Sequence, residues 1–112
     1  MTFVQPLADL RTSPTVALFE GRRHAGVELS FYDTTWKTGR GPAMHLHPYP
    51  EVFLVEAGEA TFVVDGEEVV AGSGHVVVVP ANTPHRFENR AEAPLRVLSL
   101  HPNGEVLQTA AE

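Results

Sequence analysis

Short runs rich in β-branched and aromatic residues recur along most of this chain, and several of them alternate apolar with polar positions. The runs occupy residues 15–20, 27–33, 51–56, 60–65, 67–71, 75–79, 85–88 and 95–100. Alternation with a period of two is typical of a β-strand with one buried face, and in the second run it predicts that Val27, Leu29 and Phe31 are buried. No stretch has the periodicity of a helix. Many short strands of this kind indicate an all-β sandwich or barrel.

Turn residues separate these runs. Gly58 lies between two of them, and Asp65-Gly66 is a strong signal for a two-residue hairpin turn. Prolines at positions 80, 84, 94 and 102 mark the ends of predicted strands, where a missing N–H group does little harm. The end segments, residues 1–14 and 104–112, fit edge strands, short helices or frayed ends, so their structure stays open.

Length and charge narrow the class of protein. A chain of 112 residues is of ordinary size for one domain, which we place over residues 1–112. The net charge is −6, from 8 Lys and Arg against 14 Asp and Glu, so neither nucleic acid nor an anionic membrane is expected as a partner. The chain has no cysteine, which excludes disulfides. It has no visible signal peptide and no apolar run near the ~20 residues that span a membrane, so we expect a cytoplasmic protein.

Three histidines and one glutamate stand at positions that can share one metal ion. His45 and His47 are two residues apart, so their side chains point to the same side of a β-strand. Glu51 follows beyond a Pro-Tyr-Pro segment, where the chain must bend, and His85 comes at the end of a valine-rich strand. Three imidazoles and one carboxylate suit a borderline divalent transition metal, such as Fe, Mn, Ni, Zn, Co or Cu. The sequence therefore predicts one such ion inside a β-barrel.

The spacing around these residues follows two known motifs. The first, over residues 39–58, reads G-x5-H-x-H-x3-E-x6-G, and the second, over residues 74–89, reads G-x5-P-x-N-x2-H-x3-N. Besides the four candidate ligands, their fixed positions are Gly39, Gly58, Gly74, Pro80, Asn82 and Asn89. This pattern resembles the small single-domain members of the cupin superfamily, of the conserved-barrel type, except at Asn82, where the family usually has glycine. Asparagine tolerates the left-handed backbone that such a turn requires.

The resemblance implies both the fold and the site. Cupins are jelly rolls, built as a double-stranded β-helix, so the chain is expected to form a cupin barrel. The metal ligands implied are His45, His47, Glu51 and His85. The first two should lie on the inward face of one strand, and Glu51 should open the next. In an octahedral arrangement, four protein ligands leave two positions for water or substrate, as a reactive site requires.

Other residues near the motifs are candidates for a ligand pocket. Those expected to line it are Met44, Phe53, Phe62 and Phe87, all of which also fit simple core packing. Tyr49, between two prolines beside the ligands, is the candidate catalytic residue. Trp36 fits either the rim of the pocket or a contact between subunits.

Valines 76–79 are apolar on both faces of their strand, so both faces need cover. One face can fill the barrel, and the other requires an N-terminal strand or a second subunit. Because small cupins commonly dimerise through such a surface, the resemblance implies a homodimer.

Two functions fit this sequence. The first is a metal-dependent enzyme with an oxygenase-like activity on a small organic molecule, and families with this ligand set also include isomerases and decarboxylases. The second is a non-catalytic module that binds a metal or a small ligand. The complete ligand set favours the enzyme, whereas the absence of a recognisable substrate-binding signature favours the module.

Overall fold

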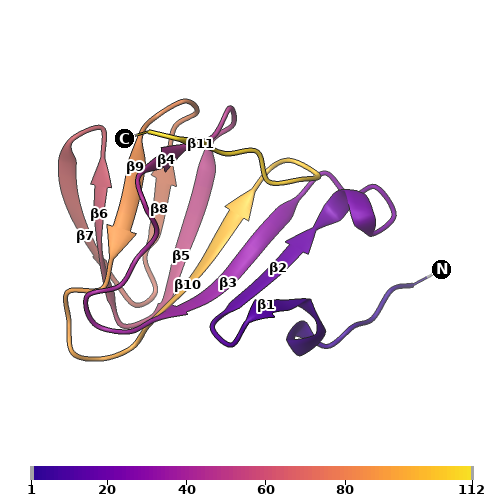
Figure 1. Ribbon diagram of the computed structural model, residues 1–112, viewed down its shortest axis with the longest axis horizontal. Coiled ribbons are helices and arrows are strands. Elements are labelled where there is room, and N and C mark those ends of the chain that lie inside the picture. Colours follow the sequence, from indigo (N-terminus) through magenta and orange to yellow (C-terminus); the bar gives the residue numbers. More distant parts are fainter. Residues whose placement is uncertain (1, 112) are drawn as a thin grey trace.

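Two antiparallel β-sheets make up the fold (Figure 1). The computed structural model describes residues 2–111 of the chain. One sheet contains, in spatial order, β1 (Arg11–Ser13), β2 (Val16–Glu20), β3 (Ser30–Trp36), β10 (Leu95–His101), β5 (Glu51–Ala57) and β8 (Val76–Val79). The other contains β11 (Thr109–Ala110), β4 (His45–Leu46), β9 (His85–Glu88), β6 (Glu59–Val64) and β7 (Glu67–Gly72). From β3 onward the chain passes back and forth between the sheets, except at the hairpin of β6 and β7, and this path confirms the predicted all-β jelly roll.

Short elements complete the fold. η1 (Leu7–Leu10) and η2 (Gly21–Arg23) are 3-10 helices, and β1 and β11 are edge strands, so the end segments that the sequence left open hold both kinds of element. Residues 1 and 112 of those segments lie outside the described part of the chain. Within residues 2–111, no helix has the length and apolar character that a membrane crossing demands.

Most of the predicted strands are confirmed to within one residue at each end. The predicted hairpin turn also forms, because Asp65 and Gly66 connect β6 to β7 and have φ angles of 49° and 82°. Both residues tolerate the left-handed backbone that this type of turn requires. Local turn chemistry therefore places this part of the fold correctly.

The strand predicted over residues 27–33 is wrong in its start. β3 begins only at Ser30, and Val27 and Leu29 are 45% and 37% exposed. The residues before β3 form a turn, in which the N–H of Val27 donates to the carbonyl of Gly21 at 3.0 Å. Val27 and Leu29 are therefore exposed although both side chains are apolar.

The predicted buried face of this segment is also wrong. Ser30 and Thr34 are the buried residues of β3, and Tyr32, on the same side of the strand, borders an internal cavity. Phe31 points the other way and stacks on Phe19 with ring centroids 5.1 Å apart. Polar residues face inward here because the hydroxyls of Ser30 and Thr34 donate to carbonyls of other segments, and because Tyr32 and Thr34 border the cavity.

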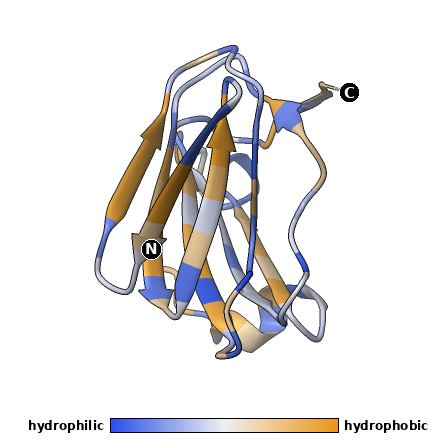
Figure 2. Cartoon of the chain, turned by 90° about the vertical axis from the view of Figure 1, so that its left-hand side faces the viewer, coloured by the Kyte–Doolittle hydropathy of each residue, from blue (hydrophilic) through white to orange (hydrophobic). Residues whose placement is uncertain are grey.

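The hydrophobic core lies between the two sheets. Its buried members come from six strands and are Phe53, Val55, Ala60, Phe62, Ala71, Val79, Phe87, Leu95 and Val97. Hydrophobic residues gather on the strands, whereas much of the connecting chain is hydrophilic (Figure 2). The rings of Phe53, Phe62 and Phe87 pack on one another with centroids 5.0–5.7 Å apart. The Phe53 ring also lies 6.0 Å from the His85 ring, so the core adjoins the candidate metal ligands.

Two asparagines of the motifs shape the loops. Asn82 has a φ of 56°, which confirms the left-handed conformation predicted for it. Asn89 is fully buried, and its Nδ2 donates to the carbonyls of Trp36 at 3.0 Å and Ala93 at 2.8 Å. The N–H of Gly39 donates to the carbonyl of Asn89 at 2.6 Å. Asn89 thus ties the end of β3 to the loop that precedes β10.

Candidate metal centre

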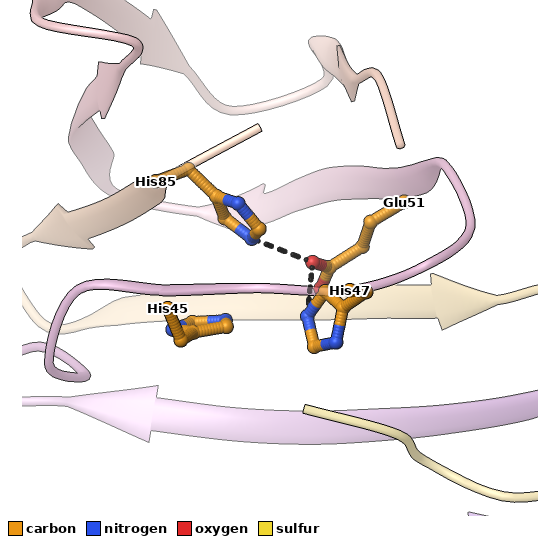
Figure 3. Close-up of side chains that lie close together, drawn as sticks. All are labelled: His45, His47, Glu51 and His85. Carbon is orange, nitrogen blue, oxygen red and sulfur yellow. Dashed lines mark hydrogen bonds and ion pairs between the residues drawn. The ribbon is translucent and has the colours of Figure 1, made fainter. Parts of the chain in front are cut away.

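The four predicted ligands come together from three neighbouring segments of the two sheets (Figure 3). β4 carries His45, which pairs across the sheet with His85 at the start of β9. His47 follows β4 directly, and Glu51 is the first residue of β5. All four side chains are buried. Residues distant in sequence meet here because the motifs place them at the ends of strands that converge.

The ligating atoms converge on one small volume. One atom from each of the four residues lies within 4.8 Å of the others. The Oε1 atom of Glu51 is 3.0 Å from His47 Nε2 and 2.9 Å from His85 Nε2 (Figure 3). A group of three imidazole nitrogens and one carboxylate oxygen at this spacing is a candidate site for one metal ion.

Backbone carbonyls fix the orientation of all three imidazoles. The Nδ1–H of His45 donates to the carbonyl of Ala43 at 2.7 Å, and that of His85 donates to Thr83 at 2.8 Å. His47 Nδ1–H donates to the carbonyl of Leu107 at 2.7 Å. A neutral imidazole that gives its proton at Nδ1 leaves the lone pair of Nε2 free for a cation. The three Nε2 atoms are therefore presented as ligands.

One buried atom supports the fit to a cation. Nε2 of His47 has no hydrogen-bond partner although it is buried, and its neighbour at 3.0 Å is the carboxylate oxygen of Glu51. In the neutral tautomer both atoms carry lone pairs, so a positive charge between them relieves an otherwise unfavourable contact. The residues fit a divalent metal ion.

The pKa values reflect the same crowding. Burial raises the pKa of Glu51, but the three imidazoles around its carboxylate, that of His101 foremost, outweigh burial and hold the pKa well below its usual range. Burial lowers the pKa of His47, but the nearby carboxylate of Glu51 and the carbonyl of Leu107 more than offset this and raise the pKa, so the space between His47 and Glu51 favours a positive charge. For His45 burial prevails and lowers the pKa, which favours a neutral ring. The carboxylate is thus ionised and ready to bind a cation.

A fourth histidine, which the sequence did not single out, belongs to this cluster. His101, the last residue of β10, is 1% exposed and its Nε2 lies 3.1 Å from Oε2 of Glu51. Its Nδ1 lies 2.8 Å from the hydroxyl of Tyr49. The sequence contained a clue to this position, because side chains alternate along a strand and His101 lies on the same buried face as Leu95 and Val97. The prediction ended the strand one residue too early.

Tyr49, the candidate catalytic residue, lies in a chain of hydrogen bonds rather than free in the pocket. Its hydroxyl accepts from the N–H of Leu107 at 3.2 Å and therefore donates to His101 Nδ1. Burial raises the pKa of Tyr49 to about 12, so the hydroxyl stays protonated at neutral pH. The chain then runs from His101 Nε2–H to Oε2 of Glu51. Tyr49 is linked to the carboxylate of Glu51 through His101, and its ring also stacks on the ring of His47 with centroids 5.2 Å apart.

The C-terminal segment passes over the site. The carbonyl of Leu107 accepts a hydrogen bond from His47 Nδ1–H, and the N–H of Leu107 donates to the hydroxyl of Tyr49. Beyond it, β11 pairs with β4, and the N–H of Ala111 donates to the carbonyl of Met44 at 3.2 Å. Figure 1 shows β11 beside β4, the strand that carries His45.

A cavity of about 210 Å³ opens beside the candidate centre. Its lining residues are Val16, Tyr32, Thr34, Trp36, Pro42, His45, Glu51, Phe53, Phe87, Ser99, His101 and Gln108. Of the residues predicted to line a pocket, Phe53 and Phe87 do so. Phe62 packs behind them in the core, and Met44 lies in the segment before β4. Trp36 borders the cavity, where its indole N–H donates to Thr34 Oγ1 at 2.8 Å.

Comparison with known families decides the class of this fold. The family described as "Cupin domain" matches residues 32–101, a stretch that contains the four candidate ligands and His101. The chain belongs to this cupin family. The resemblance read from the two motifs is therefore confirmed.

Individual proteins are also similar to this cupin. An uncharacterized protein of Methanocaldococcus jannaschii is 25% identical over 92 residues, which cover 76% of this cupin and 74% of that protein. An oxalate decarboxylase variant of Bacillus subtilis has a TM-score of 0.82 at 20% identity, and covers 93% of this cupin. The formate complex of an oxalate decarboxylase from Lactobacillus farciminis has a TM-score of 0.80 at 18% identity, over 92% of this cupin. The matches span only 30% and 34% of those two chains, and at such identities they show a shared fold.

Proposed function

We propose that this cupin binds one divalent transition metal ion through His45, His47, Glu51 and His85. We further propose that it is a metal-dependent enzyme with oxygenase-like activity on a small organic molecule. The observation that supports this most is the convergence of three imidazoles on one ionised carboxylate. The Nδ1–H of each ring donates a hydrogen bond to a backbone carbonyl, so the lone pair of each Nε2 atom is left for a cation. An ion at this point would lie at the wall of the cavity, because His45 and Glu51 also line it.

The protein's own residues have separable roles in this proposal. A bound transition metal would supply Lewis acidity and redox chemistry. The carbonyls of Ala43, Thr83 and Leu107 keep the imidazoles oriented. Tyr49 and His101 form the proton-bearing chain nearest the carboxylate.

A decarboxylase is the second enzyme class that the relatives suggest, because the two solved structures named above are oxalate decarboxylases. At such low sequence identity these structures support a shared fold but not a shared reaction. Decarboxylase activity is therefore treated as one possible outcome of the test below. A non-catalytic binding module is the other outcome.

Reconstitution under air tests the proposal. The metal-free protein is loaded separately with Fe, Mn, Ni and Zn, and oxygen uptake and carbon dioxide release are measured against a panel of small organic molecules. We expect oxygen uptake with at least one redox-active metal, lost in His85→Ala and retained in the control His75→Ala, which changes an exposed histidine outside the cluster. Carbon dioxide release without oxygen uptake would replace the oxygenase with a decarboxylase. Metal binding without turnover of any compound would favour the binding module.

A further inference from the structure

The cavity beside the candidate centre has two walls of different character. One is aromatic: the ring of Phe87 lies 5.7 Å, centroid to centroid, from the rings of both Trp36 and Phe53. The other carries polar groups from β3 and β10, namely Tyr32, Ser99 and His101. A ligand that fills this space lays an apolar face on the first wall and turns a polar edge toward the second and toward Glu51.

The volume limits the size of that ligand. About 210 Å³ is less than the roughly 300–1,000 Å³ of sites that hold drug-sized molecules. The aromatic wall, whose rings meet edge to face at 87° and 72°, and this small volume together favour a molecule with about one ring.

Charge limits the ligand further. None of the lining residues found within the described chain is a lysine or an arginine. Two arginines of the neighbouring strands and loops are already paired at the surface, Arg96 with Asp33 at 3.0 Å and Arg90 with Glu68 at 2.9 Å. The walls therefore offer no fixed cation.

The consequence for an anionic ligand is simple. A divalent ion beside the carboxylate of Glu51 leaves one positive charge, which one anionic oxygen neutralises. A second carboxylate on the same ligand would lie in a mostly apolar cavity without a cationic partner, which is strongly unfavourable.

Resting on the metal centre proposed above, we propose that this cavity selects a mostly apolar molecule of about one ring that carries at most one negative charge. Dicarboxylates are excluded by the lack of a second cation. The aromatic wall supplies the affinity, and the polar wall fixes which edge faces the centre.

A size-matched pair of probes tests this selection on zinc-loaded protein. Zinc has no redox chemistry, so binding is read without turnover. Zinc uptake is measured first by calorimetry. The probes are then ortho-methylbenzoate and phthalate, which differ by one carboxylate in place of a methyl group, with malonate as a small dianion. Binding is read by calorimetry and by the fluorescence of Trp36, the single tryptophan of the chain.

We expect ortho-methylbenzoate to bind at least about tenfold more tightly than phthalate or malonate. Gln108 lines the cavity and is exposed, so its replacement leaves the core intact. Gln108→Arg adds a cation and should raise phthalate affinity several-fold, whereas the uncharged control Gln108→Leu should not.

The outcomes separate the two proposals. If zinc binds but phthalate or malonate matches ortho-methylbenzoate, or no probe binds at all, the ligand class is overturned and the metal centre stands. If Gln108→Arg leaves phthalate affinity unchanged, charge is not the basis of selection and the proposal also fails. If zinc does not bind, both the metal centre and the ligand class are overturned.

Discussion

Nε2 of His101 lies 3.1 Å from Oε2 of Glu51, on the carboxylate oxygen that His47 and His85 do not contact. The two oxygens of one carboxylate therefore have different partners. Oε1 faces the candidate metal ligands, and Oε2 is held by an imidazole that is itself bonded to Tyr49. Such a partner orients a ligand without being one.

Removal of His101 should weaken metal binding without abolishing it. Partners of metal ligands are typically worth about 10–100-fold in affinity, so we expect His101→Ala to lower metal affinity by roughly tenfold. Competition with a chelator measures this. The control His75→Ala, at an exposed site, should bind metal like the wild type. Equal affinities in all three proteins would show that His101 does not orient Glu51.

The turn at Asn82 should tolerate glycine and resist a β-branched residue. At a φ of 56°, glycine carries no steric penalty, so Asn82→Gly should be neutral or slightly stabilising. Asn82→Val should lower the free energy of unfolding by about 1–2 kcal/mol, because its Cβ crowds the backbone in this conformation. Denaturant unfolding compares the two variants. Identical midpoints and slopes would mean that the backbone around residue 82 relaxes to another geometry.

The C-terminal segment should matter for metal binding through its backbone. Deletion of residues 107–112 removes the carbonyl that takes the Nδ1 proton of His47, so that ring is no longer held with Nε2 toward the centre. We expect metal affinity to fall by roughly tenfold or more. Leu107→Ala keeps the backbone carbonyl and is the matched control, expected to bind metal normally. A deletion variant with full affinity would contradict the role given to this segment.

The edge strand β8 is the proposed dimer contact. It ends the six-stranded sheet, and Val76 and Val78 are 59% and 62% exposed, whereas Val79 is buried in the core. We expect a homodimer at micromolar concentration by analytical ultracentrifugation, and a monomer after Val76→Lys with Val78→Lys. Val70→Lys, at a 60% exposed position of β7, should leave the dimer intact. A monomeric wild type would refute this interface.

The four candidate ligands could be identified from the sequence because they stand at fixed positions of two short motifs. His45, His47 and Glu51 stand close together in the first motif, although His47 lies just beyond β4 and not on the predicted shared strand. His85 stands in the second motif, and the resemblance to cupins joined it to the other three. The strand boundaries could also be predicted, since turn residues such as Asp65-Gly66 act at short range.

What the sequence could not predict depends on contacts at long range. The carbonyl of Leu107 serves His47 from 60 positions away through a backbone atom, which the identity of its side chain does not reveal. The buried face of β3 is polar at Ser30 and Thr34 because both hydroxyls hydrogen-bond to other segments and Thr34 borders the cavity. Hydropathy alone therefore predicted the wrong face of this segment as buried. His101 is an intermediate case. Its place on the buried face of β10 could be predicted from the alternation along the strand, but its contact with Glu51 could not.

The metal content of the purified protein tests the central claim most directly. We expect elemental analysis to find close to one divalent transition metal ion per wild-type chain. His47→Ala and His85→Ala, each of which removes one converging Nε2 atom, should bring the content far below one per chain while circular dichroism keeps its β-sheet signature. Metal content that is unchanged in both folded variants, or a wild type that takes up no divalent metal under reconstitution, would contradict the account.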